Sequence, residues 1–202
     1  LRYLSARAEE SAGNLDRADS AYARLLDGHP EDPLAQRGRM RLRARKREAA
    51  ESRSLEDVLA RANEQKGPQR AALLNMAAEL HERRIDLQSA LSTVDKALDA
   101  SPEYSPALHT RARLLERIGT DEAITAAMET LEDLAGRLVE PAHKAAALCK
   151  AGTLALRAGE KEQPNPRAWM LFGAALEADP TSTRALRGLL RTKNAHGTQG
   201  SS

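Results

Sequence analysis

The sequence predicts an all-α protein, an α-solenoid of about five helix-turn-helix hairpins followed by one C-terminal capping helix. The first observation behind this prediction is a composition rich in Ala, Leu, Arg and Glu with only 2% aromatic residues, which favours helices over sheets. The second is a helical motif that occurs three times, and the third is a turn signal before each copy. At 202 residues the chain can bury a substantial core.

The repeated motif covers residues 16–30, 88–102 and 166–180. Each copy has an alanine, a bulky residue four positions later, two small or apolar residues after that, and a closing proline. Offsets of four, seven and eight place side chains on one face of a helix, and the proline ends the helix. The matching residues are Ala18, Tyr22, Leu25, Leu26 and Pro30; Ala90, Val94, Ala97, Leu98 and Pro102; and Ala168, Phe172, Ala175, Leu176 and Pro180.

Another helix precedes each copy and ends at a glycine or a polar turn, such as Gly13 or Gly159. Glycine there permits the left-handed conformation that lets the chain turn back, so the unit is a helical hairpin. A further copy covers residues 105–134, with Ser105 as its N-cap and Gly119 as the stop of its first helix.

We expect hairpins over about 1–32, 33–68, 69–104, 105–139 and 140–181, a capping helix over 182–194 and a disordered polar tail over 195–202. The segment "REAAESRSLED" is predicted to separate the two helices of the second hairpin, and "EKEQPNPR" those of the fifth, where Asn165 is the expected N-cap. Because the sequence begins without methionine and inside a helix, we expect it to be a piece of a longer protein.

This arrangement resembles the tetratricopeptide repeat family, whose unit is a helix-turn-helix of about 34 residues with small residues at close helix contacts and a proline after the second helix. The resemblance extends from residue 1 to about residue 192 and is most specific at Pro30, Pro102 and Pro180. The early aromatic position of the family is Leu74, Leu108 and Leu148 here, and its small residue in the first helix is Ala78, Ala112 and Gly152.

The resemblance implies a concave groove, lined by the first helices of the hairpins, that receives an extended or helical peptide. The side chains opposite the buried Leu and Ala positions would line it. These predicted groove residues are Arg37, Arg41, Arg45, Asn75, Glu79, Arg83, His109, Arg113, Arg117, Cys149 and Arg157. Because arginine predominates, we expect a basic groove that favours an acidic segment or a C-terminal carboxylate.

Basic residues occupy almost every second position of "QRGRMRLRARKRE", residues 36–48. On a helix, Arg37, Arg41 and Arg45 form one stripe, and Arg39, Arg43 and Arg47 form another. One interpretation is a solvated face whose charges pair with nearby carboxylates. The other is that one stripe faces the groove, and a one-residue uncertainty in helix register leaves open which stripe that is.

Several classes of function are disfavoured. The formal net charge is only +2, from 31 basic and 29 acidic residues, so no global field recruits nucleic acid or membrane. The arginine-rich stretch lacks the aromatics that stack on single-stranded bases. No apolar run approaches the ~20 residues of a membrane span. There is no phosphate loop, nucleophile elbow or metal-ligand pair, and Cys149 has no neighbouring base, so we predict no enzyme, cofactor or metal site.

The sequence therefore favours a protein–protein interaction scaffold or adaptor that binds a peptide or a partner protein. The alternative is a structural or self-associating module of a larger protein, including a homo-oligomer. A single cysteine fits a reducing compartment or the bacterial periplasm, with the cytoplasm favoured, and the Ala- and Arg-rich composition favours a bacterial source.

Overall fold

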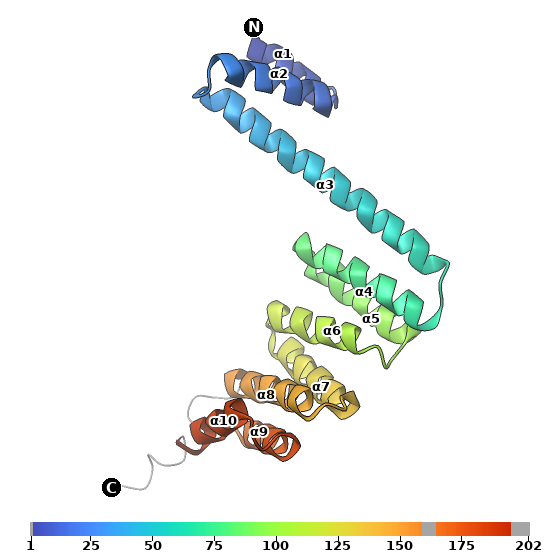
Figure 1. The fold of residues 1–202 in the computed structure, drawn as a ribbon, viewed down its shortest axis with the longest axis vertical. Coiled ribbons are helices and arrows are strands. Elements are labelled where there is room, and N and C mark those ends of the chain that lie inside the picture. Colours follow the sequence, from blue (N-terminus) through green and yellow to red (C-terminus); the bar gives the residue numbers. More distant parts are fainter. Residues whose placement is uncertain (1, 159–164, 195–202) are drawn as a thin grey trace. The chain divides into compact units, whose positions relative to one another are not determined.

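A computed structural model describes residues 2–158 and 165–194. The expected tail, 195–202, and most of the "EKEQPNPR" insertion lie outside the described residues. The chain forms two compact units, residues 1–57 and 58–202, and each is described by itself. All regular structure in the described ranges is helical, which confirms the predicted all-α class (Figure 1).

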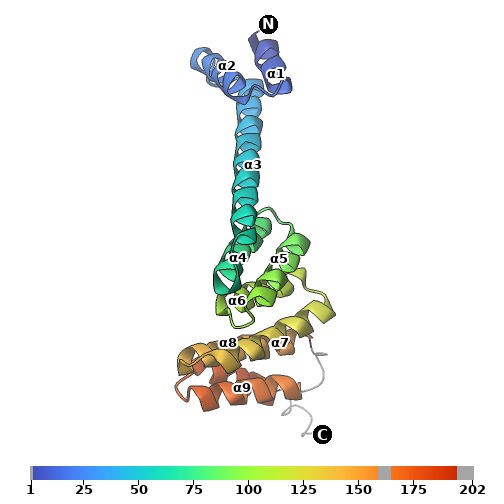
Figure 2. The ribbon, with the colours of Figure 1, turned by 90° about the vertical axis from the view of Figure 1, so that its right-hand side faces the viewer.

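Unit 1 contains α1 (Arg2–Ser11), α2 (Leu15–Gly28) and most of α3 (Pro33–Asn63). Unit 2 contains the end of α3 and seven further helices of the described range, which pack in consecutive antiparallel pairs (Figure 2). They are α4 (Gly67–Arg83), α5 (Leu87–Ala100), α6 (Ser105–Ile118), α7 (Asp121–Arg137), α8 (Pro141–Ala158), α9 (Pro166–Ala178) and α10 (Thr183–Asn194).

Side-chain caps and one glycine account for several helix ends. The Asp86 carboxylate accepts a hydrogen bond from the Ser89 amide and starts α5, and the Asn165 side chain accepts from two amides at the start of α9, as predicted for that residue. Gly119, at φ +75°, ends α6 in the left-handed conformation expected of it. The prediction for Ser105 was wrong: it is the first residue of α6, and Tyr104 precedes it as an N-cap without a side-chain hydrogen bond.

The predicted hairpin over 33–68 is not formed. Residues Pro33–Asn63 are one continuous helix, α3, and "REAAESRSLED" lies inside it. Between Arg39 and Lys66 the sequence contains no glycine or proline to break the helix, and the Arg47 side chain pairs with Glu51 one turn later at 3.1 Å. The last residues of α3 belong to unit 2, where Ala62 is part of a buried cluster and Leu59 packs against it.

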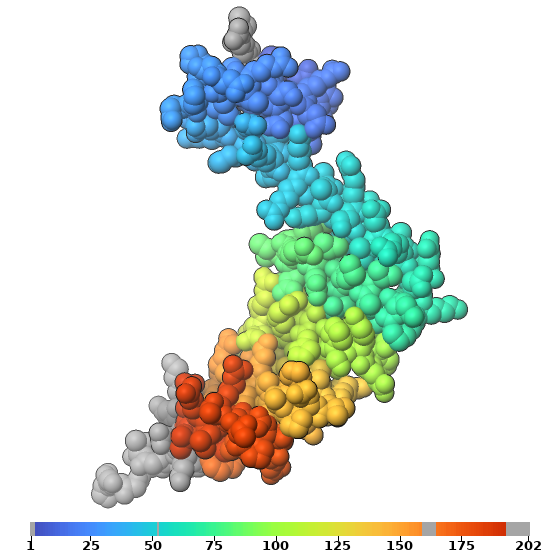
Figure 3. All heavy atoms as spheres, in the orientation of Figure 1, coloured from blue at the N-terminus to red at the C-terminus, as the bar shows by residue number. Residues whose placement is uncertain are grey.

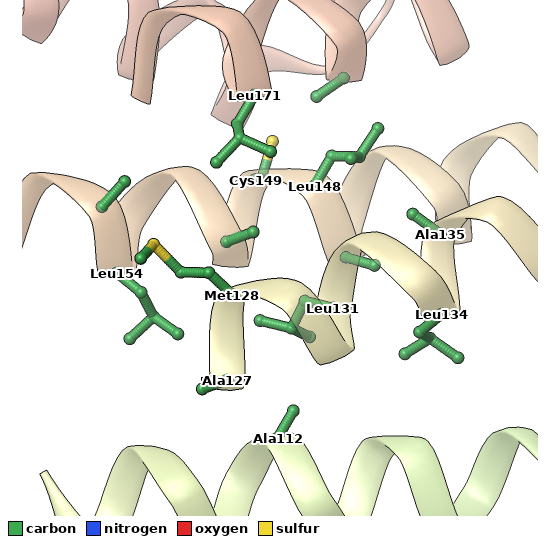
Figure 4. Packing of buried hydrophobic residues seen from close by; sticks show 14 of the residues in the cluster. Ala112, Ala127, Met128, Leu131, Leu134, Ala135, Leu148, Cys149, Leu154 and Leu171 are labelled. Carbon is green, nitrogen blue, oxygen red and sulfur yellow. The ribbon is translucent and has the colours of Figure 1, made fainter. Parts of the chain in front are cut away.

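The core of unit 2 is built from leucines and many alanines, which let neighbouring helices approach closely. The motif residues Ala90, Val94 and Ala97 of α5 are fully buried. Figure 4 shows Ala127, Met128 and Leu131 of α7 between the residues of α6 and α8, and Figure 3 shows that side chains fill the space between these helices. The repeated positions therefore do what their spacing predicts: they bury one face of each helix.

Two aromatic rings fill the space left by glycines. The Tyr22 ring of α2 lies against Gly38 of α3, where a Cβ atom would be 2.5 Å from the ring. The Phe172 ring of α9 lies against Gly152 of α8 and Gly188 of α10, so that any Cβ at Gly188 would overlap it. Tyr22 and Phe172 hold equivalent places in the repeated motif, and both are at most 2% exposed.

Candidate functional site

Two neighbouring pairs of first helices in unit 2 pack directly on each other. α4 packs on α6, and α8 packs on α10, whereas the second helices α5, α7 and α9 do not pack on one another within the described ranges. α6 and α8 do not pack directly on each other, and α7 packs on both of them. We call the exposed side of α4, α6, α8 and α10 the first-helix face.

Charged residues on this face form a chain of ion pairs between successive helices. Glu82 of α4 accepts from Arg113 Nη2 at 2.6 Å and from Arg117 Nη1 at 2.7 Å, both on α6. Glu116 of α6 lies 3.1 Å from Lys150 Nζ and 3.0 Å from Arg157 Nη1, both on α8. We call these four contacts the ion-pair ladder.

The ladder shows what the sequence interpretation missed. It named Arg113, Arg117 and Arg157 as groove cations but not Glu82 and Glu116, the carboxylates that pair with them. The signal was present, because each glutamate follows an aligned leucine, Leu74 or Leu108, by eight residues. The ladder lowers the positive charge expected of the face without cancelling it.

Other predicted groove residues are less available than expected. Cys149 is fully buried, its Sγ lies 4.0 Å from Ser182 Oγ, and burial raises the pKa of its thiol. Asn75 is only 7% exposed, and its Nδ2 donates to Glu79 Oε1 at 3.3 Å. Neither side chain offers a free surface to a partner, because both are held within the helical packing.

Two further predicted residues lie at the surface of the face, in addition to the arginines of the ladder. Arg83 is exposed at the end of α4, and His109 is exposed on α6. Partial desolvation lowers the pKa of His109, and the nearby charge of Lys150 lowers it further. Both effects favour the neutral form of the His109 imidazole.

The arginines of residues 36–48 act mainly inside unit 1. Arg41 forms a two-pronged pair with Glu10 of α1, with Nε at 2.7 Å and Nη2 at 2.6 Å, and Arg45 lies 3.9 Å from the same carboxylate. Arg39 pairs with Asp19 of α2 at 3.2 Å. These pairs support the interpretation in which the charges pair with nearby carboxylates, and they attach α3 to both preceding helices.

Arg37 differs from these arginines. It is exposed on α3, and no carboxylate lies within 4.0 Å of it in the part of unit 1 that the structure describes. The expected grouping of Arg37, Arg41 and Arg45 with the cations of unit 2 in one groove stays a prediction.

Glu10 is the centre of this network. It is only 4% exposed, and Tyr22 Oη donates to its Oε2 at 2.9 Å. The hydrogen bonds from Arg41 lower the pKa of Glu10 to about 2, and the bond from Tyr22 acts in the same direction against the effect of burial. The carboxylate is thus buried and ionised because three donors hold it.

The described residues contain neither a metal-binding cluster nor a membrane-spanning helix. No three His, Cys, Asp or Glu side chains gather there closely enough to hold a metal ion. None of the described helices is long and apolar enough to cross a membrane.

Replacing Glu82 by glutamine is expected to lower the free energy of unfolding of unit 2 by only about 0.5 to 1 kcal/mol. The reason is that Arg113 and Arg117 are 47% and 43% exposed, so water can hydrate them when the carboxylate is removed. Urea denaturation would measure the change. When Glu82→Gln is added to a variant that already carries Arg113→Gln and Arg117→Gln, the further loss in the free energy of unfolding should be small. A loss above about 3 kcal/mol for Glu82→Gln alone would mean that the pair behaves as a buried one.

No protein-family model matches the sequence, and the comparison with curated proteins found no match. Solved structures do match. MamA is 14% identical, with a TM-score of 0.50 over 95% of this chain and 84% of that one. YrrB, a TPR protein with an unusual peptide-binding site, is 17% identical, with a TM-score of 0.49 over 92% and 89%.

A third structure, a tetratricopeptide repeat protein from Parabacteroides merdae, is 14% identical, with a TM-score of 0.45 over 97% and 72% of the two chains. At such low identities a structural match reports on the fold alone. The expected tetratricopeptide-like helical repeat fold is confirmed.

Proposed function

We propose that the chain is an interaction scaffold that binds an acidic segment of a partner protein along the first-helix face of unit 2. One observation carries the proposal: the arginines of this face reach from one helix to the carboxylate of the preceding helix and still keep much of their surface in solvent. The side chains of Arg113, Arg117 and Arg157 are 47%, 43% and 59% exposed. A carboxylate arriving from a partner can therefore contact the same guanidinium groups.

The chemistry suits an extended acidic peptide. A guanidinium has five donors, and Glu82 and Glu116 occupy only some of them. The remaining donors suit a ligand that accepts two parallel hydrogen bonds, as a carboxylate does. Because the cations follow one another from α6 to α8, an extended segment lying across these helices would meet several of them.

Binding can be tested with two labelled peptides, one containing glutamate and leucine and the other a copy with glutamine in place of glutamate. The full chain is expected to bind the acidic peptide more tightly in fluorescence anisotropy. Replacing Arg117 and Arg157 together by glutamine should weaken that binding by about three- to tenfold. The matched control is Arg137→Gln on α7, a second helix, which should leave the affinity unchanged. Equal affinity for the two peptides would contradict the proposal.

The second candidate is self-association through α10. Leu186 and Leu190 lie one turn apart on this helix and are each 52% exposed, an apolar strip that a polar cap would not need. Light scattering over a range of concentrations would decide it. A mass that rises with concentration, and that Leu186→Gln with Leu190→Gln returns to the monomer value, would favour this candidate over the peptide-binding scaffold.

A further inference from the structure

The carboxylates of the ion-pair ladder occupy the same position in two successive first helices, α4 and α6. The third first helix, α8, has no carboxylate at that position. Leu74, Leu108 and Leu148 hold equivalent positions in α4, α6 and α8. Eight residues after the first two come Glu82 and Glu116, which carry the ladder. Eight residues after Leu148 comes Leu156, a partly buried apolar side chain. The third step of the ladder therefore lacks its carboxylate.

The next helix nevertheless supplies cations for that step. Arg184, Arg187 and Arg191 lie on α10 with spacings of three and four residues, which place them on one side of the helix. All three are exposed, and none has a carboxylate within 4.0 Å among the residues that the structure describes. This contrasts with Arg113, Arg117 and Arg157, each of which has one.

These arginines surround a hollow between α8 and α10. The pocket has a volume of about 640 Å³ and is lined by the three arginines, together with Lys150 and Thr153 of α8. Leu156 and the edge of Phe172 supply its apolar part, and no carboxylate belongs to the described lining. Lys150 already pairs with Glu116, so the unmatched positive charge comes from α10.

We infer that this α8–α10 pocket anchors the acidic segment, with a partner carboxylate standing where the ladder lacks its own. The inference rests on the proposed function and names the anchoring place and its chemistry. The partner carboxylate accepts from Arg187 and Arg191, as Glu82 accepts from Arg113 and Arg117 in the first step of the ladder. Its aliphatic stem, or an adjacent apolar side chain, covers Leu156. The expected ligand is a segment in which acidic and apolar residues alternate.

The ladder itself argues for a carboxylate ligand rather than nucleic acid. In the two complete steps the arginines bind a carboxylate carried on a flexible aliphatic side chain, in the same fold and between equivalent helices. The lining of the pocket includes one aromatic ring, and Phe172 is 2% exposed, so no ring is available for stacking on a base.

A single substitution can restore the missing carboxylate. Leu156→Glu is expected to pair with the arginines of α10 inside the chain and so compete with the partner. Leu156→Gln has nearly the same size and polarity without the charge, which makes it the matched control. With the labelled glutamate and leucine peptide, Leu156→Glu should bind at least about tenfold more weakly than Leu156→Gln. Arg187→Gln with Arg191→Gln should weaken binding to a similar degree, and circular dichroism would verify that each variant keeps its helices.

The outcomes separate the pocket from the wider proposal. If the chain binds the peptide, and Arg117→Gln with Arg157→Gln weakens it, while Leu156→Glu and Leu156→Gln bind equally, the pocket is overturned and the first-helix face survives. If the wild-type chain binds the acidic peptide and its glutamine copy with equal affinity, both proposals fail. If a single-stranded oligonucleotide of equal charge displaces the peptide and binds more tightly, the pocket is a nucleic-acid site and the inference is overturned.

Discussion

Replacing Phe172 by alanine is expected to lower the free energy of unfolding of unit 2 by about 3 to 5 kcal/mol. The ring is 2% exposed and lies between three helices, α8, α9 and α10. It is the side chain that fills the space left by Gly152 and Gly188, so alanine would leave a cavity lined by backbone that cannot collapse easily. Loss of the ring would also loosen α10 and with it the arginines of the α8–α10 pocket.

Urea denaturation followed by circular dichroism would measure this loss. The matched control is Trp169→Ala on the same helix, since Trp169 is 47% exposed and its removal should cost under about 1 kcal/mol. Trp169 is the single tryptophan of the chain, so its fluorescence reports on α9 in the Phe172→Ala variant. A loss below about 1 kcal/mol for Phe172→Ala would contradict this prediction. It would mean that the helices close the cavity beside Gly152 and Gly188 at little cost.

The fold was predictable where the spacing of apolar residues determines which face of a helix is buried. The alanines and bulky residues of the motif are buried in α2, α5 and α9 because their spacing leaves them no other place in a helix. The course of α3 was not predictable in the same way. The repeat pattern predicted a turn in the middle of this segment. The residues there are strong helix formers with no glycine or proline among them, so the helix continues without a break.

The candidate site was predictable only in part, for a physical reason. Helical periodicity identifies which residues lie on a face, and Arg113, Arg117 and Arg157 lie on the first helices α6 and α8. That they line a binding groove stays a prediction. Whether a cation is free depends on the side chains of the neighbouring helix, and these come from residues about 30 to 40 positions away. That is why Glu82 and Glu116 were missed and why the arginines of α10 were not singled out.

The buried network of unit 1 makes its stability depend on pH. The pKa of Glu10 is lowered from 4.5 to about 2, chiefly by the hydrogen bonds from Arg41, so folding favours the ionised form. The stabilisation is fully present above pH 4.5 and is lost as the pH falls from there toward 2, because the unfolded chain binds the proton first. At 1.36 kcal/mol per pKa unit the contribution is at most about 3.4 kcal/mol.

Replacing Glu10 by glutamine is expected to remove this contribution. Glutamine keeps an oxygen for Tyr22 Oη, 2.9 Å away in the native chain, but it cannot neutralise Arg41. At pH 7 the variant should lose about 2 to 3 kcal/mol of unit 1 stability relative to the wild type, and the difference should shrink toward zero near pH 2. Urea titration followed by the amide NMR signals of α1 and α2 would report on unit 1 alone.

The control Glu48→Gln removes an exposed carboxylate of α3 and should change unit 1 stability by less than about 0.5 kcal/mol at either pH. A Glu10→Gln loss that is equal at pH 7 and near pH 2 would mean that the shape of the side chain matters and its charge does not. A loss confined to neutral pH would show that Arg41 stabilises unit 1 through the buried carboxylate of Glu10. The charge of Arg41 would then be committed to the fold, and an acidic partner would have to be recognised by other cations, such as the exposed arginines of α10.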